Sequence, residues 1–373
     1  MTSSSPTDQE PQPYITCFMN KKVLVFHPTS VRDEEVEALV HKIRRACLRG
    51  EAVNMTEMLM SVLINIVSPC VFSNKSEDGC SKYGPLAKSL TTTFTGFYVG
   101  DFFPCLRWVD VVTGQIPRMK QLFAEFDEFL NGVAREHGAG ADEKDLFYVI
   151  MQLRKDGTYE MDLTPDNVKA TLLDIFVGGN DTSATTTKWV MAELLNNASS
   201  MKKVQEEVRN VVGDKPKIDM EDINKMEYLK CVIKEALRLH QPDVFVIRRT
   251  SASVKLGGYD VPSDTTIWIN AWAINRDPKW WEKPDEFIPE RFQKNSIDFQ
   301  GQDFHYIPFG FGRWGCPGMS FAVTLVEYVI ANLLYWFDWK LPASEHLDMT
   351  ELYGITVAKK IPLHVLPISR SSY

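Results

Sequence analysis

The segment PFGFGRWGCPG, residues 308–318, is the most informative stretch of this 373-residue chain. It places four glycines around one cysteine, Cys316. Glycine lets a backbone turn tightly and approach a flat group closely, and we expect a helix to begin just after Cys316, at residues 317–319. A sulfur at a helix N-terminus is favoured as thiolate by the helix dipole and by free backbone N–H groups. The pattern therefore fits a metal-binding thiolate, although a glycine-rich turn with an inert buried cysteine is the simpler alternative.

A second informative stretch interrupts the longest predicted helix, residues 165–196. Thr164 can cap this helix and Pro165 suits its first position. Near its middle, residues 178–183 read GGNDTS, and two glycines alone cost about 2 kcal/mol relative to alanine in a helix. Such a violation of local preference predicts either a kink or helix boundary, or a functional site.

A third pattern is the pair Glu235 and Arg238, three residues apart on a helix predicted at about residues 226–240. The apolar residues of this helix share one face, and the two charges lie opposite that face. Taken alone, the spacing is typical of a solvated surface ion pair, which would contribute roughly a few tenths of a kcal/mol to the free energy of unfolding.

Together these patterns resemble the cytochrome P-450 superfamily. The spacing Phe309-x-x-Gly312-x-x-x-Cys316-x-Gly318 is similar to its heme-binding loop, and the other motifs follow in the family's order. Residues 270–278 and 354–357 also look like the large plant microsomal branch. The resemblance covers nearly all of the chain from about residue 25.

The resemblance implies a mainly α fold with a small β component, a single large helical domain over residues 25–373 that lacks the family's N-terminal portion. Residues 1–24 are expected to form a polar, disordered tail. Helices are also predicted at about residues 34–48, 55–66 and 117–136, strands at 254–256 and 265–270, and a buried core helix at 321–337.

Residue roles follow from the same resemblance. Cys316 would be the axial ligand of the heme iron, and Asp181 and Thr182 would deliver protons to dioxygen. Heme would be held by Phe309, Gly312, Arg313, Gly318 and Arg248, with Arg249 as the alternative to Arg248. Glu235, Arg238 and Arg291 would form a buried structural cluster. The substrate pocket would be lined by Phe176, Val177 and Gly178, and by the segments 244–247 and 355–357, which contain Val246 and Ile355.

The implied activity is a monooxygenase that uses heme b, O2 and electrons from NADPH through a reductase. It would insert one oxygen atom into a small hydrophobic substrate of secondary-metabolite type. The resemblance implies a location at the cytosolic face of the endoplasmic reticulum membrane, with a cytosolic or peripheral location as the alternative. Two alternatives stay open: a heme-thiolate isomerase or dehydratase, and a truncated, non-catalytic fragment with weak or no heme binding.

Some positions depart from the family pattern. Trp314 stands where Arg or His is usual, and Gln241-Pro242 replaces the usual Pro-Pro. The family's N-terminal membrane helix, and a helix whose Trp and Arg contact heme propionates, have no counterpart in the sequence. We therefore expect no membrane anchor in this chain and weaker heme retention, because each lost charge-assisted hydrogen bond costs about 1.5–3 kcal/mol.

Composition limits the other classes of function. The formal net charge of −8 argues against a general nucleic-acid binder, which needs a basic face. The seven cysteines are odd in number, widely spread and without a C-x-x-C pair, which argues against a disulfide framework, a zinc ribbon and an iron–sulfur site. The seven histidines show no H-x-x-x-H spacing.

Overall fold

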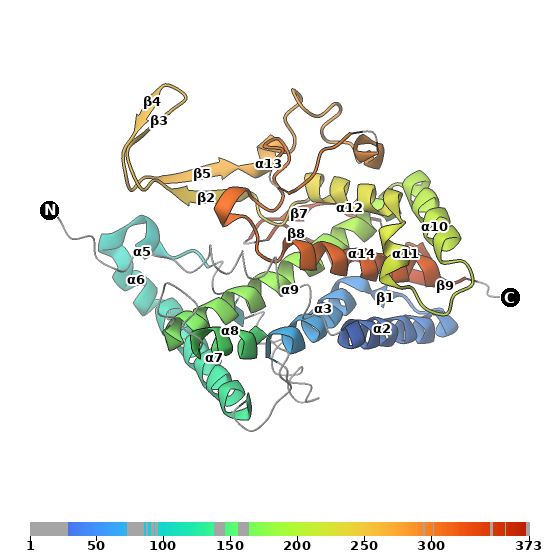
Figure 1. Ribbon diagram of the computed structural model, residues 1–373, viewed down its shortest axis with the longest axis horizontal. Coiled ribbons are helices and arrows are strands. Elements are labelled where there is room, and N and C mark those ends of the chain that lie inside the picture. The colour runs from blue at the N-terminus through green and yellow to red at the C-terminus, as the bar shows by residue number, and fades with distance from the viewer. Residues whose placement is uncertain are drawn as a thin grey trace.

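The architecture is known from a computed structural model, which describes residues 29–72, 86, 89–90, 93, 96–137, 146–155, 164–293, 295–300, 302–343, 346–354 and 356–370. The predicted tail at residues 1–24 lies outside these residues. Figure 1 shows a mostly helical molecule in which one long helix, α9 (Pro165–Asn196), crosses the middle, while two of the small sheets lie at the upper left edge of the view. The expected fold class, mainly α with a minor β component, is confirmed.

The described helices cover most of the chain. The longer ones are α2 (Thr29–Arg49), α3 (Met55–Phe72), α7 (Gln115–His137), α8 (Leu146–Lys155), α9 (Pro165–Asn196), α10 (Ala198–Val212), α12 (Glu227–Leu239) and α14 (Met319–Trp336). The shorter ones are α5 (Val99–Phe102), α6 (Arg107–Val112), α11 (Met220–Asn224) and α13 (Ala271–Ile274), with 3-10 turns η3 (Pro104–Leu106), η4 (Pro289–Phe292) and η5 (Gly312–Trp314).

The strands form small antiparallel sheets. They are β1 (Val53–Asn54), β2 (Phe245–Arg249), β3 (Val254–Leu256), β4 (Tyr259–Val261), β5 (Thr266–Asn270), β6 (Phe337–Lys340), β7 (Glu351–Leu352), β8 (Ala358–Lys359) and β9 (His364–Ser369). Strand β9 lies between β1 and β6, so the C-terminal strand joins segments from both ends of the described chain. Strands β2 and β5 pair with Phe245 opposite Asn270, and β7 pairs with β8.

Helix α9 is continuous from Pro165 to Asn196, so the predicted helix is confirmed and a helix boundary within it is excluded. Thr164 caps it by accepting a hydrogen bond from the Asn167 backbone N–H. Inside the weak segment, side chains donate to carbonyls four residues back: Asn180 to Phe176 at 2.7 Å and Thr182 to Gly178 at 2.5 Å. Tertiary packing compensates for the poor helix propensity, since α3, α12 and α14 all contact α9.

The buried apolar side chains form two clusters on either side of the weak segment of α9. The larger cluster joins α2, α3, α10, α12 and α14, and the smaller one joins α7, α8 and the first half of α9. Phe321 at the start of α14 packs against both clusters. Helices α3 and α14 are apolar and long enough to cross a membrane, yet most of each is buried within the fold. The prediction that residues 321–337 form a core helix is therefore confirmed.

Candidate active site

The cysteine loop is a tight turn that ends where α14 begins. Gly310 and Gly312 have φ angles of +68° and +69°, a region in which side chains other than glycine are strained. The Cys316 backbone N–H donates to the Phe309 carbonyl at 2.9 Å, which closes the loop. The sulfur therefore stands at the entry to α14, as the glycine pattern predicted.

The surroundings of Cys316 disfavour a free thiolate. Burial among protein atoms raises the pKa of the thiol to about 11, although the Gly318 backbone N–H hydrogen-bonds to the sulfur and lowers it, and the charge of Asp243 raises it further. The sulfur is nevertheless accessible, because it faces an internal cavity. A thiolate at this position would be stabilised by a bound cation.

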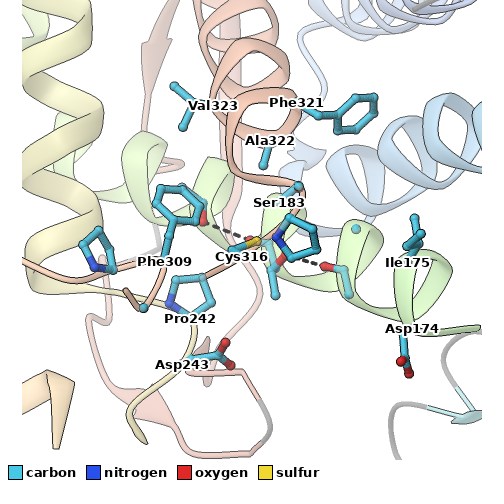
Figure 2. Close-up of a pocket in the computed structure, with 18 of the residues that line it drawn as sticks. Asp174, Ile175, Ser183, Pro242, Asp243, Phe309, Cys316, Phe321, Ala322 and Val323 are labelled. Atoms are coloured by element: carbon cyan, nitrogen blue, oxygen red, sulfur yellow. Dashed lines mark hydrogen bonds between the residues drawn. The ribbon is translucent and has the colours of Figure 1, made fainter. Parts of the chain in front are cut away.

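The cavity has a volume of about 410 Å³ and lies between α9, α14, the cysteine loop and the segment leading into β2. Figure 2 shows Cys316 at its centre, with Ala322 and Val323 of α14 above and Ser183 of α9 nearby. Most of the lining is apolar, as is usual for pockets that bind small molecules or cofactors.

These residues fit a porphyrin better than a bare metal ion. Among the described residues, no group of three or more His, Cys, Asp and Glu side chains could hold an ion. A metal bound to Cys316 must therefore bring most of its own ligands. Gly178 lies on the α9 wall, and a Cβ built there would meet nothing within 4 Å, which leaves room for a broad flat group.

The predicted acid–alcohol pair is only partly directed to the cavity. Thr182 lines it, whereas Asp181 is not among the lining residues and accepts a hydrogen bond from Thr356 at 2.5 Å. The sequence analysis expected residues 355–357 to line the pocket, but Thr356 is not among the lining residues. Its hydrogen bond with Asp181 was not anticipated, because 175 residues separate the two and no local pattern joins them.

The other predicted site residues divide into two groups. Gly178, Val246, Arg248, Phe309 and Gly318 line the cavity.

The remaining ones do not, or cannot be placed. Phe176 is fully buried in the smaller apolar cluster, and Val177 packs against the same cluster. Gly312 shapes the cysteine loop without lining the cavity. The Arg313 side chain and Ile355 lie outside the described part of the structure.

Of the two arginines considered for the cofactor, Arg248 is the one at the cavity. Its guanidinium donates to the Trp314 carbonyl at 3.3 Å, so it lies beside the cysteine loop. Arg249 points to the other side of β2 and forms an ion pair with Asp264. This geometry favours Arg248 as the candidate propionate ligand.

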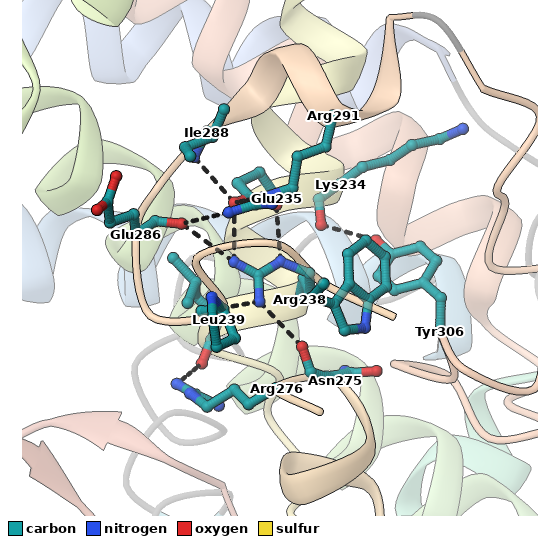
Figure 3. A network of polar contacts seen from close by, with 12 residues as sticks. Lys234, Glu235, Arg238, Leu239, Asn275, Arg276, Glu286, Ile288, Arg291 and Tyr306 are labelled. Carbon is teal, nitrogen blue, oxygen red and sulfur yellow. Dashed lines mark hydrogen bonds and ion pairs between the residues drawn. The ribbon is translucent and has the colours of Figure 1, made fainter. Parts of the chain in front are cut away.

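Behind the cysteine loop, Glu235, Arg238 and Arg291 form one buried cluster (Figure 3). Both Glu235 oxygens accept hydrogen bonds from Arg238 at 2.8 Å, and the Arg291 Nε donates to Glu235 at 3.1 Å. Glu235 and Arg238 are fully buried, so the alternative of a solvated surface pair is wrong.

The cluster fixes the backbone that follows α13. Arg238 donates to the carbonyls of Asn275, Pro284 and Glu286 at 2.9, 2.6 and 3.1 Å. The Asn275 side chain in turn accepts a hydrogen bond from the Ile307 backbone N–H, directly before the cysteine loop. The buried charges therefore position the loop that carries Cys316.

A second buried polar cluster lies beside the cavity and was not anticipated. The His240 ring nitrogens lie 2.7 Å from Glu193 and 2.9 Å from Glu351. Trp189 stacks on the imidazole with ring centroids 3.9 Å apart, and its indole N–H donates to the Val357 carbonyl. We call Glu193, His240 and Glu351 the imidazole clamp; it joins α9, the end of α12 and β7.

Both hydrogen bonds of the imidazole clamp form when His240 is charged. Ionised carboxylates only accept hydrogen bonds, so each ring nitrogen must donate one. Burial lowers the pKa of His240, but the hydrogen bonds and charges of Glu193 and Glu351 outweigh it and raise the pKa overall. Burial raises the pKa of Glu351, yet His240 and the Tyr353 hydroxyl lower it overall. Arg276 also faces Glu351, at 3.9 Å.

Comparisons with known proteins agree with this geometry. The family model for cytochrome P450 matches residues 15–366. The chain is 48% identical to a phenylacetaldehyde oxime monooxygenase of Prunus mume over 350 residues, which is 90% of this chain and 66% of that protein. It is 45% identical to cytochrome P450 71A1 of Persea americana, over 90% of this chain and 70% of that protein. The chain thus spans about two thirds of the length of these relatives.

A further relative is a desmethylyatein synthase of Sinopodophyllum hexandrum, 42% identical over 94% of this chain and 72% of that protein. Among solved structures, a zebrafish cytochrome P450 with abiraterone matches with a TM-score of 0.81 and 22% identity, covering 96% of this chain and 81% of that one. This last likeness establishes the fold alone.

The buried cluster makes a prediction about stability. Replacing Glu235 with Gln removes the carboxylate between two buried guanidinium groups, and we expect a loss of about 3–5 kcal/mol in the free energy of unfolding. Urea denaturation measures it. The matched control is Asp338→Asn, which breaks the half-exposed pair with Arg209 and should cost at most about 1 kcal/mol. Equal losses in both variants would contradict the structural role of the cluster.

The imidazole clamp makes a prediction about pH. Because the folded pKa of His240 is raised, its contribution to stability is complete below the unfolded value of about 6.5. The contribution is lost as pH rises through the folded pKa. When thermal unfolding of the wild type and His240→Gln is measured from about pH 5 to 9, the difference between their melting temperatures should be largest at the acidic end. A difference in melting temperature that grew as pH rose would show that His240 is not charged in the folded protein.

Proposed function

This chain belongs to the cytochrome P450 family, and on that basis we propose that it is a heme-thiolate monooxygenase with Cys316 as the iron ligand. The observation that carries the proposal is the position of Cys316. Its sulfur faces a largely apolar cavity, accepts a hydrogen bond from Gly318 and stands at the start of α14. The relatives include a monooxygenase and a further cytochrome P450.

In the proposed reaction, one atom of O2 enters a small hydrophobic substrate and the other leaves as water. Two protons and two electrons complete the balance, and NADPH supplies the electrons through a reductase. When bound, heme b supplies the redox chemistry, and a thiolate ligand favours cleavage of the O–O bond.

The residues of this chain would contribute binding, orientation and proton transfer. Cys316 would hold the iron, and Arg248 would pair with a propionate at the cavity edge beside Trp314. The Thr182 hydroxyl, now bonded to the Gly178 carbonyl, is the part of the acid–alcohol pair that faces the cavity. Asp181 would pass protons to it through water, while Thr356 holds its carboxylate in place.

The apolar lining supports a hydrophobic substrate. Val67, Val246, Phe309 and Val326 contribute to the walls from α3, β2, the cysteine loop and α14. The plant relatives include a phenylacetaldehyde oxime monooxygenase, a desmethylyatein synthase and a strychnine-11-hydroxylase, which supports a substrate of secondary-metabolite type. By likeness to these relatives we also propose a location at the endoplasmic reticulum membrane, facing the cytosol.

The absorption spectrum of the dithionite-reduced protein with carbon monoxide tests the iron ligand. We expect a red-shifted, thiolate-type Soret band that is absent in Cys316→Ser. Cys70→Ser is the matched control, because Cys70 also lines the cavity and burial raises the pKa of its thiol to about 12. We expect that variant to keep the band.

Three results would contradict the proposal in different ways. A protein that binds no heme would favour the non-catalytic alternative. A thiolate band that survives in Cys316→Ser would assign the ligand elsewhere. Turnover that needs neither reductase nor NADPH would favour the isomerase or dehydratase alternative.

A further inference from the structure

Charged side chains are few in the cavity, and two of them have no evident role in the proposed reaction. Among the described lining residues, Asp174, Asp243 and Arg248 carry formal charges. Arg248 donates to the carbonyls of Ile247 and Trp314, so it is oriented toward the cysteine loop. The two aspartates remain to be explained.

Asp243 lies in the segment between α12 and β2 and is exposed to the cavity. No hydrogen bond or ion pair to its carboxylate exists among the described residues; the nearby Gln241 side chain donates to the Asp243 backbone carbonyl instead. The surrounding protein raises the pKa of Asp243 to about 6 by burial. A carboxylate that opens into a largely apolar cavity, with no partner among the described residues, can accept a hydrogen bond from a ligand bound there.

Asp243 is also close to the reaction centre. Its charge acts on the Cys316 thiol, and Figure 2 shows it next to Pro242, below Cys316. Asp174 is on α9, two turns before Thr182, which places it roughly 12 Å along the helix axis from that hydroxyl. In Figure 2 its carboxylate is turned away from Cys316. The two aspartates are therefore not equivalent.

We propose that Asp243 is a substrate-binding residue that selects hydrophobic substrates carrying a protonated amine. The inference rests on the proposed function, since it assumes that this cavity receives the substrate. The amine would form a charge-assisted hydrogen bond with the Asp243 carboxylate, while the apolar walls hold the rest of the molecule.

The chemistry of the carboxylate favours an ammonium group over a neutral donor. An ionised carboxylate can only accept hydrogen bonds, so its ligand must donate one. A charged donor forms the stronger bond and also neutralises the charge of the carboxylate. A hydrogen bond to a charged group corresponds to about 10- to 100-fold in affinity. An anionic substrate would be repelled from the same position.

Calorimetric titration tests this selectivity at about pH 8, where an aspartate of raised pKa is still ionised. The probes are N,N-dimethylphenethylamine, its neutral counterpart phenethyl alcohol, and the anion phenylpropionate. We expect the wild type to bind the amine at least about tenfold more tightly than the alcohol. Asp243→Asn should lose that preference and bind the alcohol as before, and Asp174→Asn, the matched control, should retain it. Asp243→Lys should prefer phenylpropionate.

The proposal is overturned if the wild type shows no preference for the amine, or if the preference survives in Asp243→Asn. The wild-type comparison decides the matter even where a variant does not fold. An amine preference without a thiolate-type spectrum would sustain this inference and refute the monooxygenase proposal. A thiolate-type spectrum without an amine preference would do the reverse.

Discussion

The rest of the structure depends on the burial of one charged side chain, that of Arg238. A guanidinium with no exposure to water must satisfy its five N–H groups within the protein, or the fold loses several kcal/mol, roughly 3–5 for a broken buried pair. Glu235 neutralises its charge, and the carbonyls of Asn275, Pro284 and Glu286 accept the remaining donors. These carbonyls belong to a stretch with little regular structure. The N–H groups of Arg238 therefore supply hydrogen bonds that backbone N–H groups would supply in a helix or sheet.

This arrangement explains how a glycine-rich loop can hold a precise shape. Glycines at positive φ make the turn around Cys316 possible, but glycine also loses more conformational entropy on folding than other residues do. The loop is held from outside: Asn275 links the cluster to Ile307, and Phe309 accepts the Cys316 N–H. At the end of α12, the helix that carries Glu235 and Arg238, the imidazole clamp joins α9 to β7 and holds the start of the segment that enters β2. Both polar clusters thus lie outside the largely apolar lining of the cavity and meet at α12.

Local patterns in the sequence were sufficient for the main elements. The capped start of α9, the apolar run of α14 and the strands β3 and β5 were predicted close to their observed bounds, because capping and periodicity are local properties. The cysteine loop and the buried triad were placed by resemblance to a family, and their geometry agrees. Contacts between distant segments could not be predicted: Thr356 with Asp181, and His240 with Glu351, depend on how the C-terminal segment folds back. Nothing in the sequence was a reason to select Asp243, because its position in the cavity depends on the tertiary structure.

The central claim, that the charged cluster around Glu235 and Arg238 holds the cysteine loop, is tested most directly by hydrogen exchange in Arg291→Lys. Lysine keeps the charge of this side chain but not the fork that reaches Glu235 and the Lys283 carbonyl. Arg209→Lys, at the surface pair with Asp338, is the reference. The account predicts that the Gly310 and Cys316 amides exchange at least about tenfold faster in Arg291→Lys, while the Val53 and Val365 amides of the distant sheet do not change. Unchanged exchange in the cysteine loop, or an equal acceleration at every amide, would contradict it.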